Sequence, residues 1–308
     1  MTPDEHTLSE QMLAVGDGHE LYVYDWGNPA ASVPIVFLHG GPGAGIKDRY
    51  KATFDPAVQR VIFFDQRGCG KSTPYGSLEH NTTWEQIEDI EKIAETFGLE
   101  TCIITGGSWG SCLALAYALK YPGRVKAMVL RGIFTGSQAE VDYLDKGHFA
   151  THFPDVWDRY LDATPAKYHD DPGKYHTTRI LGDDVEAARE SAYAYGNLEG
   201  ALLALDDRFT PPTFDDTYDP VLSKLEIHYM VNRCFMPDRY IMDNAHKLKM
   251  PIWLIQGRYD FVCPPVTAYE LNEKLPNSHL IWTTAGHGND RPNYDVNRTI
   301  LLQMTGTA

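Results

Sequence analysis

The sequence has few cysteines, no long hydrophobic run and no basic leader. Its cysteines form no C-x-x-C pair, which argues against a disulfide framework and a thiolate zinc site. Cys102 and Cys112 lie in apolar runs, so we expect them in the core. No apolar stretch reaches the roughly 20 residues that a membrane helix needs. The acidic start, MTPDEHTLSEQ, does not resemble a secretory signal, and we expect a cytoplasmic protein.

Positive charge is also scarce. The chain has 27 Lys and Arg against 42 Asp and Glu, a formal net charge of −15. Such a chain is a poor partner for nucleic acid or an anionic membrane. The histidines fall in no H-E-x-x-H or comparable spacing, so we expect no metal, and no other cofactor is indicated. The sequence does not indicate an oligomeric state.

The first part of the chain, residues 1–133, alternates strand and helix patterns. Short apolar segments such as VPIVFLHG and VQRVIFFDQ are typical of strands buried on both faces. The helical pattern TTWEQIEDIEKIAETFG begins at a threonine cap and ends at Gly98. Further segments continue the alternation: TCIITGG, SWGSCLALAYALKYP and VKAMVLRG. This order predicts a mostly parallel sheet with helices on both faces.

The pattern changes after this first part. Residues 134–245 have short helical patterns and Asp/Pro-rich breaks, but no clear buried strand. Strand patterns return at PIWLIQG and SHLIWTTAG, with helices expected near 265–275 and from about Tyr294. We therefore predict an α/β core made of residues 1–133 and 246–308, with a helical cap inserted at 134–245.

The predicted cap carries most of the negative charge. Residues 134–245 contain 21 Asp and Glu and 10 Lys and Arg, a net charge of −11 out of −15. A solvated helical surface explains this excess. The alternative is a lid whose negative potential draws cationic substrates into a cleft. Charge counts do not separate the two.

One serine stands between glycines at the start of a helical pattern, in TGGSWGSCLALAYA. A plain strand-to-helix turn needs glycine for close backbone approach. G-x-S-x-G is also the nucleophile elbow, which exposes a serine hydroxyl above a sheet at a helix N-terminus. The pentapeptide alone leaves both interpretations of Ser108 open.

The acid and the base that a serine nucleophile requires follow in order. PIWLIQGRYD places Asp260 directly after a predicted strand, and HLIWTTAGH does the same for His287. In α/β-hydrolases the order is serine, acid, histidine, on loops at the carboxyl ends of strands. Alone, Asp260 could cap a helix and His287 could be a surface histidine. Together with Ser108, they predict a catalytic triad.

A second glycine-rich segment supplies candidate oxyanion donors. HGGPG, residues 39–43, follows a buried strand and bares backbone N–H groups. The N–H of Gly41 and that of Trp109, just after the nucleophile, would form an oxyanion hole. The alternative is a plain Gly/Pro turn. Because the chain also has a candidate nucleophile elbow at Ser108, we favour the oxyanion hole over the plain turn.

These segments together resemble the prolyl iminopeptidases, a family of serine peptidases with the α/β-hydrolase fold. The matching segments run in the family's order over essentially the whole chain: HGGPG, DQRGCGKS with NTTW, GGSWGS with LALAYA, LRGIF, GRYDFVCP and AGH. The resemblance implies that Ser108 is the nucleophile, Asp260 the acid and His287 the base, with the oxyanion hole at Gly41 and Trp109. It further implies release of an unblocked N-terminal residue, typically proline, from short peptides or amino acid amides.

The resemblance also implies how the substrate's amine is bound. Glu199 lies in NLEGALLAL, where the family has Trp-Glu-Gly, and Glu226 lies in KLEIHYMVNR, which resembles the family's Arg-Ile-Glu-x-His-Tyr. A buried ammonium needs carboxylate partners, although a single glutamate on such a helix is more often merely solvated. By the same resemblance Phe134 and Cys263 would line the pocket for the pyrrolidine ring.

Three departures from the family pattern concern the substrate more than the chemistry. YGNLE, with Tyr195 and Leu198, stands where the family has Trp-x-x-Trp-Glu, GNDRPN follows the base, and AEVDYLDKGH is less aromatic than its counterpart. An L-amino acid amidase, or an ester hydrolase with a remodelled cap, is therefore the alternative. A non-catalytic protein of this fold would have lost a triad residue, and none is lost.

Overall fold

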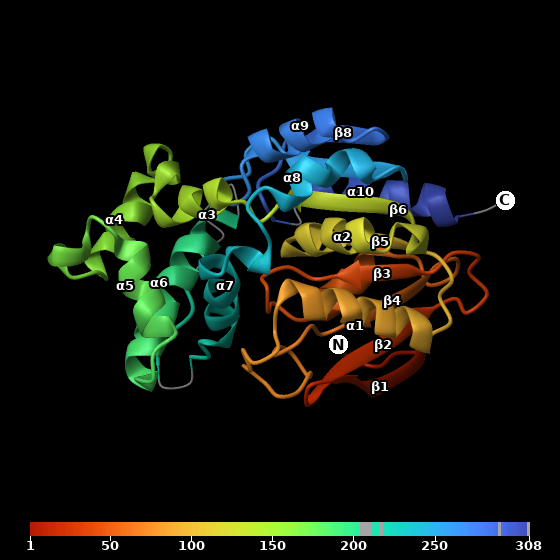
Figure 1. Ribbon diagram of the computed structural model, residues 1–308, viewed down its shortest axis with the longest axis horizontal. Helices are drawn as coiled ribbons and strands as arrows, with labels where there is room; N and C mark the ends of the chain where they lie inside the picture. The colour runs from red at the N-terminus through yellow and green to blue at the C-terminus, as the bar shows by residue number, and fades with distance from the viewer. Residues whose placement is uncertain (204–210, 216–217, 289–290, 307–308) are drawn as a thin grey trace.

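An eight-stranded sheet lies at the centre of the computed structural model, which describes residues 1–203, 211–215, 218–288 and 291–306 (Figure 1). The strands are β1 Thr7–Gly16, β2 His19–Gly27, β3 Ile35–Leu38, β4 Arg60–Phe64, β5 Cys102–Ser108, β6 Val125–Ile133, β7 Ile252–Gly257 and β8 Ser278–Thr283. Their order across the sheet is β1-β2-β4-β3-β5-β6-β7-β8. From β4 to β8 all neighbours are parallel, which confirms the predicted sheet.

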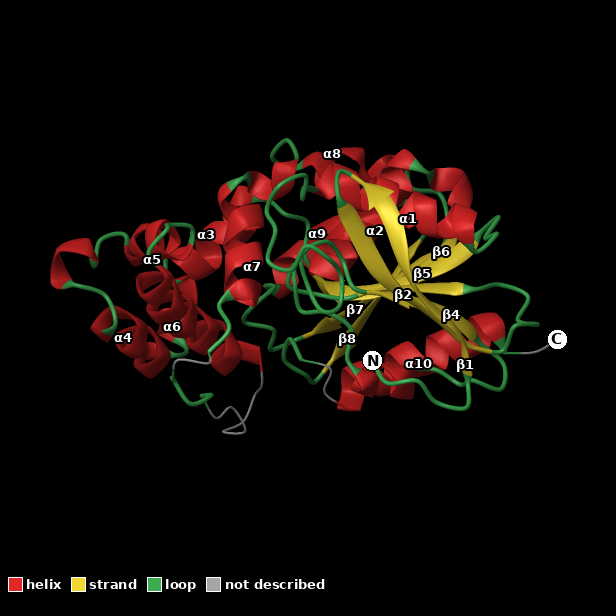
Figure 2. Ribbon diagram, turned by 90° about the horizontal axis from the view of Figure 1, so that it is seen from below, coloured by secondary structure: helices red, strands yellow, loops and turns green. Residues whose placement is uncertain are grey.

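The helices follow the strands in an alternating order. They are α1 Thr83–Thr96, α2 Trp109–Lys120, α3 Gln138–Asp145, α4 Pro154–Asp162, α5 Pro172–Ile180, α6 Val185–Leu203, α7 Val221–Val231, α8 Tyr240–Asn244, α9 Pro265–Lys274 and α10 Arg291–Thr305. Figure 2 shows α1, α2 and α8 on one side of the sheet and α10 on the other. Among the described residues, no helix has the length and apolar character to cross a membrane.

Alternate residues of the central strands pack on opposite faces. In β3, Val36 and Leu38 join the core formed with α1, α2 and α9, whereas Ile35 and Phe37 join the core that includes residues of α10. Because successive side chains of a strand point to opposite faces, a strand covered on both faces must be apolar throughout. This explains why its sequence is a continuous apolar run. The predicted core cysteines, Cys102 and Cys112, are buried there, and all five cysteines are free.

The sequence analysis missed the two strands at the edge of the sheet. β1 and β2 form an antiparallel hairpin, and β2 is antiparallel to β4. The side chains of β1 are mostly exposed and polar, so the strand has no apolar run to reveal it. Pairing with β2 stabilises the extended conformation of β1, which its own sequence does not specify.

Between β6 and β7, the described part of residues 134–245 is helical. Figure 1 shows α3, α4, α5, α6 and α7 gathered to one side of the sheet. The division into core and cap remains our prediction. Some residues named in the sequence analysis lie outside the described ranges. They are Asp206, Asp207, Arg208 and Asp216 of the acidic cap segment, and Asn289 and Asp290 of GNDRPN.

Two glycines allow the start of α2 to pass close to the end of β3. A Cβ atom on Gly106 would lie 2.7 Å from the carbonyl oxygen of Leu38, and one on Gly110 would lie 2.2 Å from the same oxygen. Real Cβ atoms do not approach backbone oxygens so closely, and neither element can move cheaply within the sheet. The glycines around Ser108 are therefore required by close packing.

We expect Gly110→Ala to destabilise the protein by about 2 kcal/mol or more, because the added methyl group overlaps the Leu38 carbonyl. Urea unfolding monitored by circular dichroism measures the change. Gly123→Ala is the matched control, since a Cβ there meets nothing within 4 Å; its effect should stay within about 0.5 kcal/mol. Equal effects of the two substitutions would contradict the packing argument.

Candidate active site

Ser108 occupies a strained turn between β5 and α2. Its backbone has φ 58° and ψ −129°, outside the regions that a residue with a side chain normally adopts. Such strain persists only where the surrounding structure enforces it, and it is concentrated at functional sites. Ser108 lines two cavities, and Gly41 lines both of them as well.

Asp260 and His287 form a buried pair beyond the ends of β7 and β8. His287 Nδ1 lies 2.9 Å from Asp260 Oδ2 and 3.1 Å from Oδ1. The carboxylate is itself fixed by the backbone N–H groups of Val262 and Cys263, at 3.0 and 2.7 Å, and by the side-chain amide of Gln256 at 3.1 Å. With Nδ1 held by the carboxylate, Nε2 is the ring nitrogen available for proton transfer.

The structure brings His287 to the same cavity as Ser108 and Gly41. We call this the outer cavity; it has a volume of about 590 Å³. Ser108 and His287 thus face one space, and Asp260 contacts the imidazole at Nδ1. The roles of the three residues as a catalytic triad remain our prediction.

Gln66 links the HGGPG loop to the nucleophile turn, and the sequence analysis gave it no role. Its backbone N–H donates to His39 Nε2 at 3.1 Å, and its side-chain amide donates to the His39 carbonyl at 3.0 Å. Its side-chain oxygen accepts from Trp109 Nε1 at 3.0 Å. All three residues are almost fully buried. Gln66 therefore holds the loop of Gly41 and the first residue of α2 in a fixed relation.

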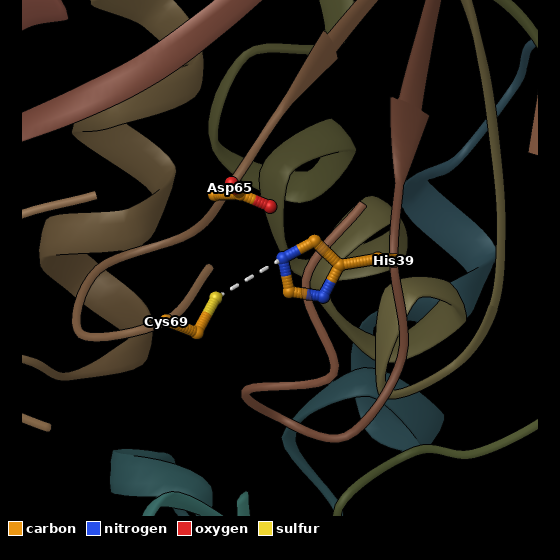
Figure 3. A group of neighbouring side chains, drawn as sticks. All are labelled: His39, Asp65 and Cys69. Carbon is orange, nitrogen blue, oxygen red and sulfur yellow. Dashed lines mark hydrogen bonds between the residues drawn. The ribbon is translucent and has the colours of Figure 1, made fainter. Parts of the chain in front are cut away.

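His39, at the start of this loop, lies together with Asp65 and Cys69, and the three offer the donor atoms of a metal site (Figure 3). The hydrogen bonds assign them another role. Since His39 Nε2 accepts the Gln66 N–H, its Nδ1 must carry the proton that is donated to the Gly40 carbonyl. The Cys69 thiol donates to the Gln66 carbonyl, and burial raises the pKa of this thiol well above its ordinary value.

Asp65 completes the same cluster as a structural acceptor. Its carboxylate accepts the backbone N–H groups of Ile46 at 2.6 Å and Lys71 at 2.8 Å. A metal would have to displace the Gln66 N–H from the imidazole, and it would need a thiolate that burial disfavours. The cluster therefore braces the loop and is no metal site.

A smaller cavity also has Ser108 in its lining. We call it the inner cavity. All the residues that the family resemblance assigned to substrate binding line it: Phe134, Glu199, Glu226 and Cys263. Val141 and Leu144 also line it; both belong to AEVDYLDKGH, the segment that is less aromatic than its family counterpart. The cavity is thus mostly apolar, with carboxylates at particular points.

Glu199 on α6 and Glu226 on α7 are joined by a hydrogen bond between their side chains. Two carboxyls can share such a bond only when one of them carries a proton. Burial raises the pKa of both groups, and the neighbouring Glu199 charge raises that of Glu226 further, to well above its ordinary value. Within the part of the chain that the structure describes, Glu226 Oε2 is buried without a hydrogen-bond partner. An acceptor in this state is suited to a donor from a ligand.

Two further carboxyls line the inner cavity, and the sequence analysis did not identify either. Glu140 accepts hydrogen bonds from Thr135 and Ser137, so its charge is compensated. Asp145 has no ion pair or hydrogen bond to its carboxylate in the described parts of the chain, and burial raises its pKa to about 6. Both belong to a segment noted only for having few aromatic residues.

The fold and the Ser108, Asp260 and His287 arrangement are those of a serine hydrolase with the α/β-hydrolase fold. Residues 33–289 match the family model for that fold. A crystal structure of proline iminopeptidase from Mycobacterium smegmatis has the same fold, with a TM-score of 0.65 at 19% identity, covering 96% of this chain and 97% of that one.

Sequence comparison narrows the class further. Proline iminopeptidase of Xylella fastidiosa is 38% identical over 298 residues, which cover 95% of this chain and 93% of the relative. A probable proline iminopeptidase of Leptolyngbya boryana is 38% identical over 281 residues, covering 90% and 87%. The chain belongs to the proline iminopeptidase family, and it is a serine aminopeptidase.

The raised pKa of Glu226 predicts a loss of stability at higher pH. Below the ordinary glutamic acid pKa, both the folded and the unfolded chain hold this proton. As the pH rises, the unfolded chain ionises first, which favours unfolding. We expect Glu226→Gln to gain at least about 1 kcal/mol relative to the unsubstituted protein between pH 5 and pH 8, measured by urea unfolding without substrate. Glu273→Gln, at an exposed position of α9, should give parallel curves; parallel curves for Glu226→Gln would refute the shared proton.

The role of Gln66 is open to a separate test. Gln66→Met removes both side-chain hydrogen bonds of the loop, and we expect kcat to fall about tenfold while KM changes less than about twofold. Gln59→Met is the matched control, because Gln59 is a buried glutamine with two side-chain hydrogen bonds at the other end of β4. It should lose stability but keep its kcat. A similar kcat in both variants would make Gln66 merely structural.

Proposed function

We propose that this enzyme releases an unblocked N-terminal residue, preferably proline, from short peptides or amino acid amides. The observation that carries the proposal is a single cavity lined by Ser108, Glu199 and Glu226. A nucleophile and a pair of buried carboxyls on one small cavity are what the cleavage of a bond next to a free amine requires. The names of the relatives support the preference for proline.

The proposed reaction proceeds through an acyl-enzyme. Ser108 Oγ attacks the carbonyl carbon of the first residue while His287 takes its proton, and Asp260 holds the imidazole in the required tautomer. The N–H groups of Gly41 and Trp109 stabilise the oxyanion of the tetrahedral intermediate. His287 then protonates the leaving amine, and it activates the water that hydrolyses the ester.

The substrate's ammonium group is proposed to take the place of the proton shared by Glu199 and Glu226. A cation between the two carboxyls removes the repulsion that keeps one of them neutral. The unpaired Oε2 of Glu226 supplies an acceptor for one N–H of the cation. N-acylation of the substrate would abolish this interaction, since it removes the charge.

The lining of the inner cavity supports an apolar first residue. Phe134, Val141 and Leu144 bound it, and such side chains suit an aliphatic ring better than a polar side chain. We also propose that residues 134–245 form the cap that covers this residue. The helices α6 and α7 of that segment carry the two amine-binding glutamates.

Initial rates on matched substrates test the proposal. We expect cleavage of proline anilide in preference to the alanine and phenylalanine anilides, no cleavage of N-acetylproline anilide, and no activity in Ser108→Ala. Activity that ignores proline, or that survives acetylation, would assign the enzyme to amide or ester substrates outside peptide trimming.

The glutamates are tested separately. Glu199→Gln or Glu226→Gln should raise KM for free-amine substrates at least tenfold, because a charge-assisted hydrogen bond is worth about 1.5–3 kcal/mol. The rate on a simple acyl ester should change less than about twofold. Glu186→Gln is the control on α6, the helix of Glu199, since Glu186 is exposed and pairs with Arg189. If ester and amine substrates suffered equally, the carboxyls would be structural.

A further inference from the structure

The outer cavity carries positive charge that the proposed reaction does not use. Lys47, Arg49 and Arg131 line it together with Ser108 and His287. None of the three cations has a carboxylate partner among the described residues, although the chain as a whole is strongly acidic. Cations without partners beside a nucleophile suggest an anionic ligand.

Arg131 lies deepest of the three, directly beside the nucleophile turn. It belongs to β6, and a Cβ atom on Gly107 would lie 2.7 Å from both Cγ and Cζ of its side chain. Its Nη1 makes a long hydrogen bond of 3.4 Å to the His287 carbonyl. Burial lowers the pKa of Arg131, and the nearby Asp260 carboxylate opposes this shift. Because no described carboxylate forms a salt bridge with this partly buried guanidinium, a ligand's anion would stabilise it.

Arg49 adds a second guanidinium to the same space. Its Cζ lies 5.5 Å from the centre of the Tyr50 ring, which holds the side chain over the aromatic face. It is close enough to Arg131 to lower the pKa of that group. Two cations that repel one another across a cavity form a ready site for a carboxylate, which accepts hydrogen bonds from both.

Of the charged residues that line the two cavities, the cations are confined to the outer one. Glu199 and Glu226 line both cavities and lie where the substrate's amine is bound, whereas the cations line only the outer cavity. A free dipeptide or tripeptide has the same polarity, with an ammonium at one end and a carboxylate about 3.5 Å per residue further along. A peptide amide or an anilide has only the ammonium.

We propose that Arg49 and Arg131, with Lys47 at the rim, bind the C-terminal carboxylate of a short peptide. The enzyme's preferred substrates are then free dipeptides and tripeptides. This inference rests on the proposed function, because the carboxylate must lie on the leaving-group side of the scissile bond. It adds recognition of the far end of the substrate to recognition of the amine.

Matched substrate pairs test the subsite. The kcat/KM for Pro-Ala should exceed that for Pro-Ala amide, and Arg49→Gln should lower this acid-to-amide ratio about tenfold, the effect of losing one charge-assisted hydrogen bond. Arg49 is exposed, so the substitution leaves the fold intact. Lys126→Gln, which removes a positive charge from an exposed position of β6 outside both cavities, should leave the ratio unchanged.

Binding gives a second readout without turnover. In Ser108→Ala, calorimetry should show tighter binding of Pro-Ala than of its amide, and the difference should shrink in the double variant with Arg49→Gln and at higher salt. An acid-to-amide ratio near one, or equal losses on both substrates in Arg49→Gln, would overturn the subsite.

Failure of the proposed function would give a different result, because proline anilide would not be cleaved. The carboxylate subsite could still be tested in that case. The dipeptide and the dipeptide amide would then begin with the residue that the anilide panel favours.

Discussion

The contact between the start of α2 and the end of β3 governs the geometry of the site. Because Gly106 and Gly110 bring the helix against the Leu38 carbonyl, the residues that follow Leu38 and the residue that precedes α2 must meet. The HGGPG loop and Ser108 are those residues. Gln66 then fixes the separation, through hydrogen bonds to His39 and Trp109. The site is therefore held by backbone packing first and by buried polar contacts second.

The buried ionisable groups around Ser108 oppose stability. Glu226 is buried with an unpaired oxygen, and Arg131 is desolvated with no carboxylate partner in the described chain. Elsewhere buried charges are compensated, as in the Arg67–Asp89 pair, where two hydrogen bonds of 2.7 and 2.8 Å join the guanidinium to the carboxylate. Ionisable groups that are paired in the core but unpaired around a cavity are the pattern expected of a ligand-binding site, and they support the proposals made above.

The sequence predicted what depends on local pattern. The apolar runs marked the parallel strands, the spacing of glycines marked the turn at Ser108, and strand ends marked Asp260 and His287. It did not predict β1, whose strand conformation comes from its partner, nor the roles of Gln66, Arg131 and Asp145. A polar side chain has no periodicity of its own, and its role depends on which distant segment packs over it. For Glu199 and Glu226, only family resemblance supplied the signal.

The two glutamates and the nucleophile come from different parts of the chain. Glu199 and Glu226 belong to α6 and α7, which lie to one side of the sheet, whereas Ser108 terminates one of its central strands (Figure 1). Under the proposed function, substitutions in α6 and α7 are expected to change which first residue is accepted without altering the turn that holds Ser108. Evolution or protein engineering could then change the substrate preference of such a chain separately from its chemistry.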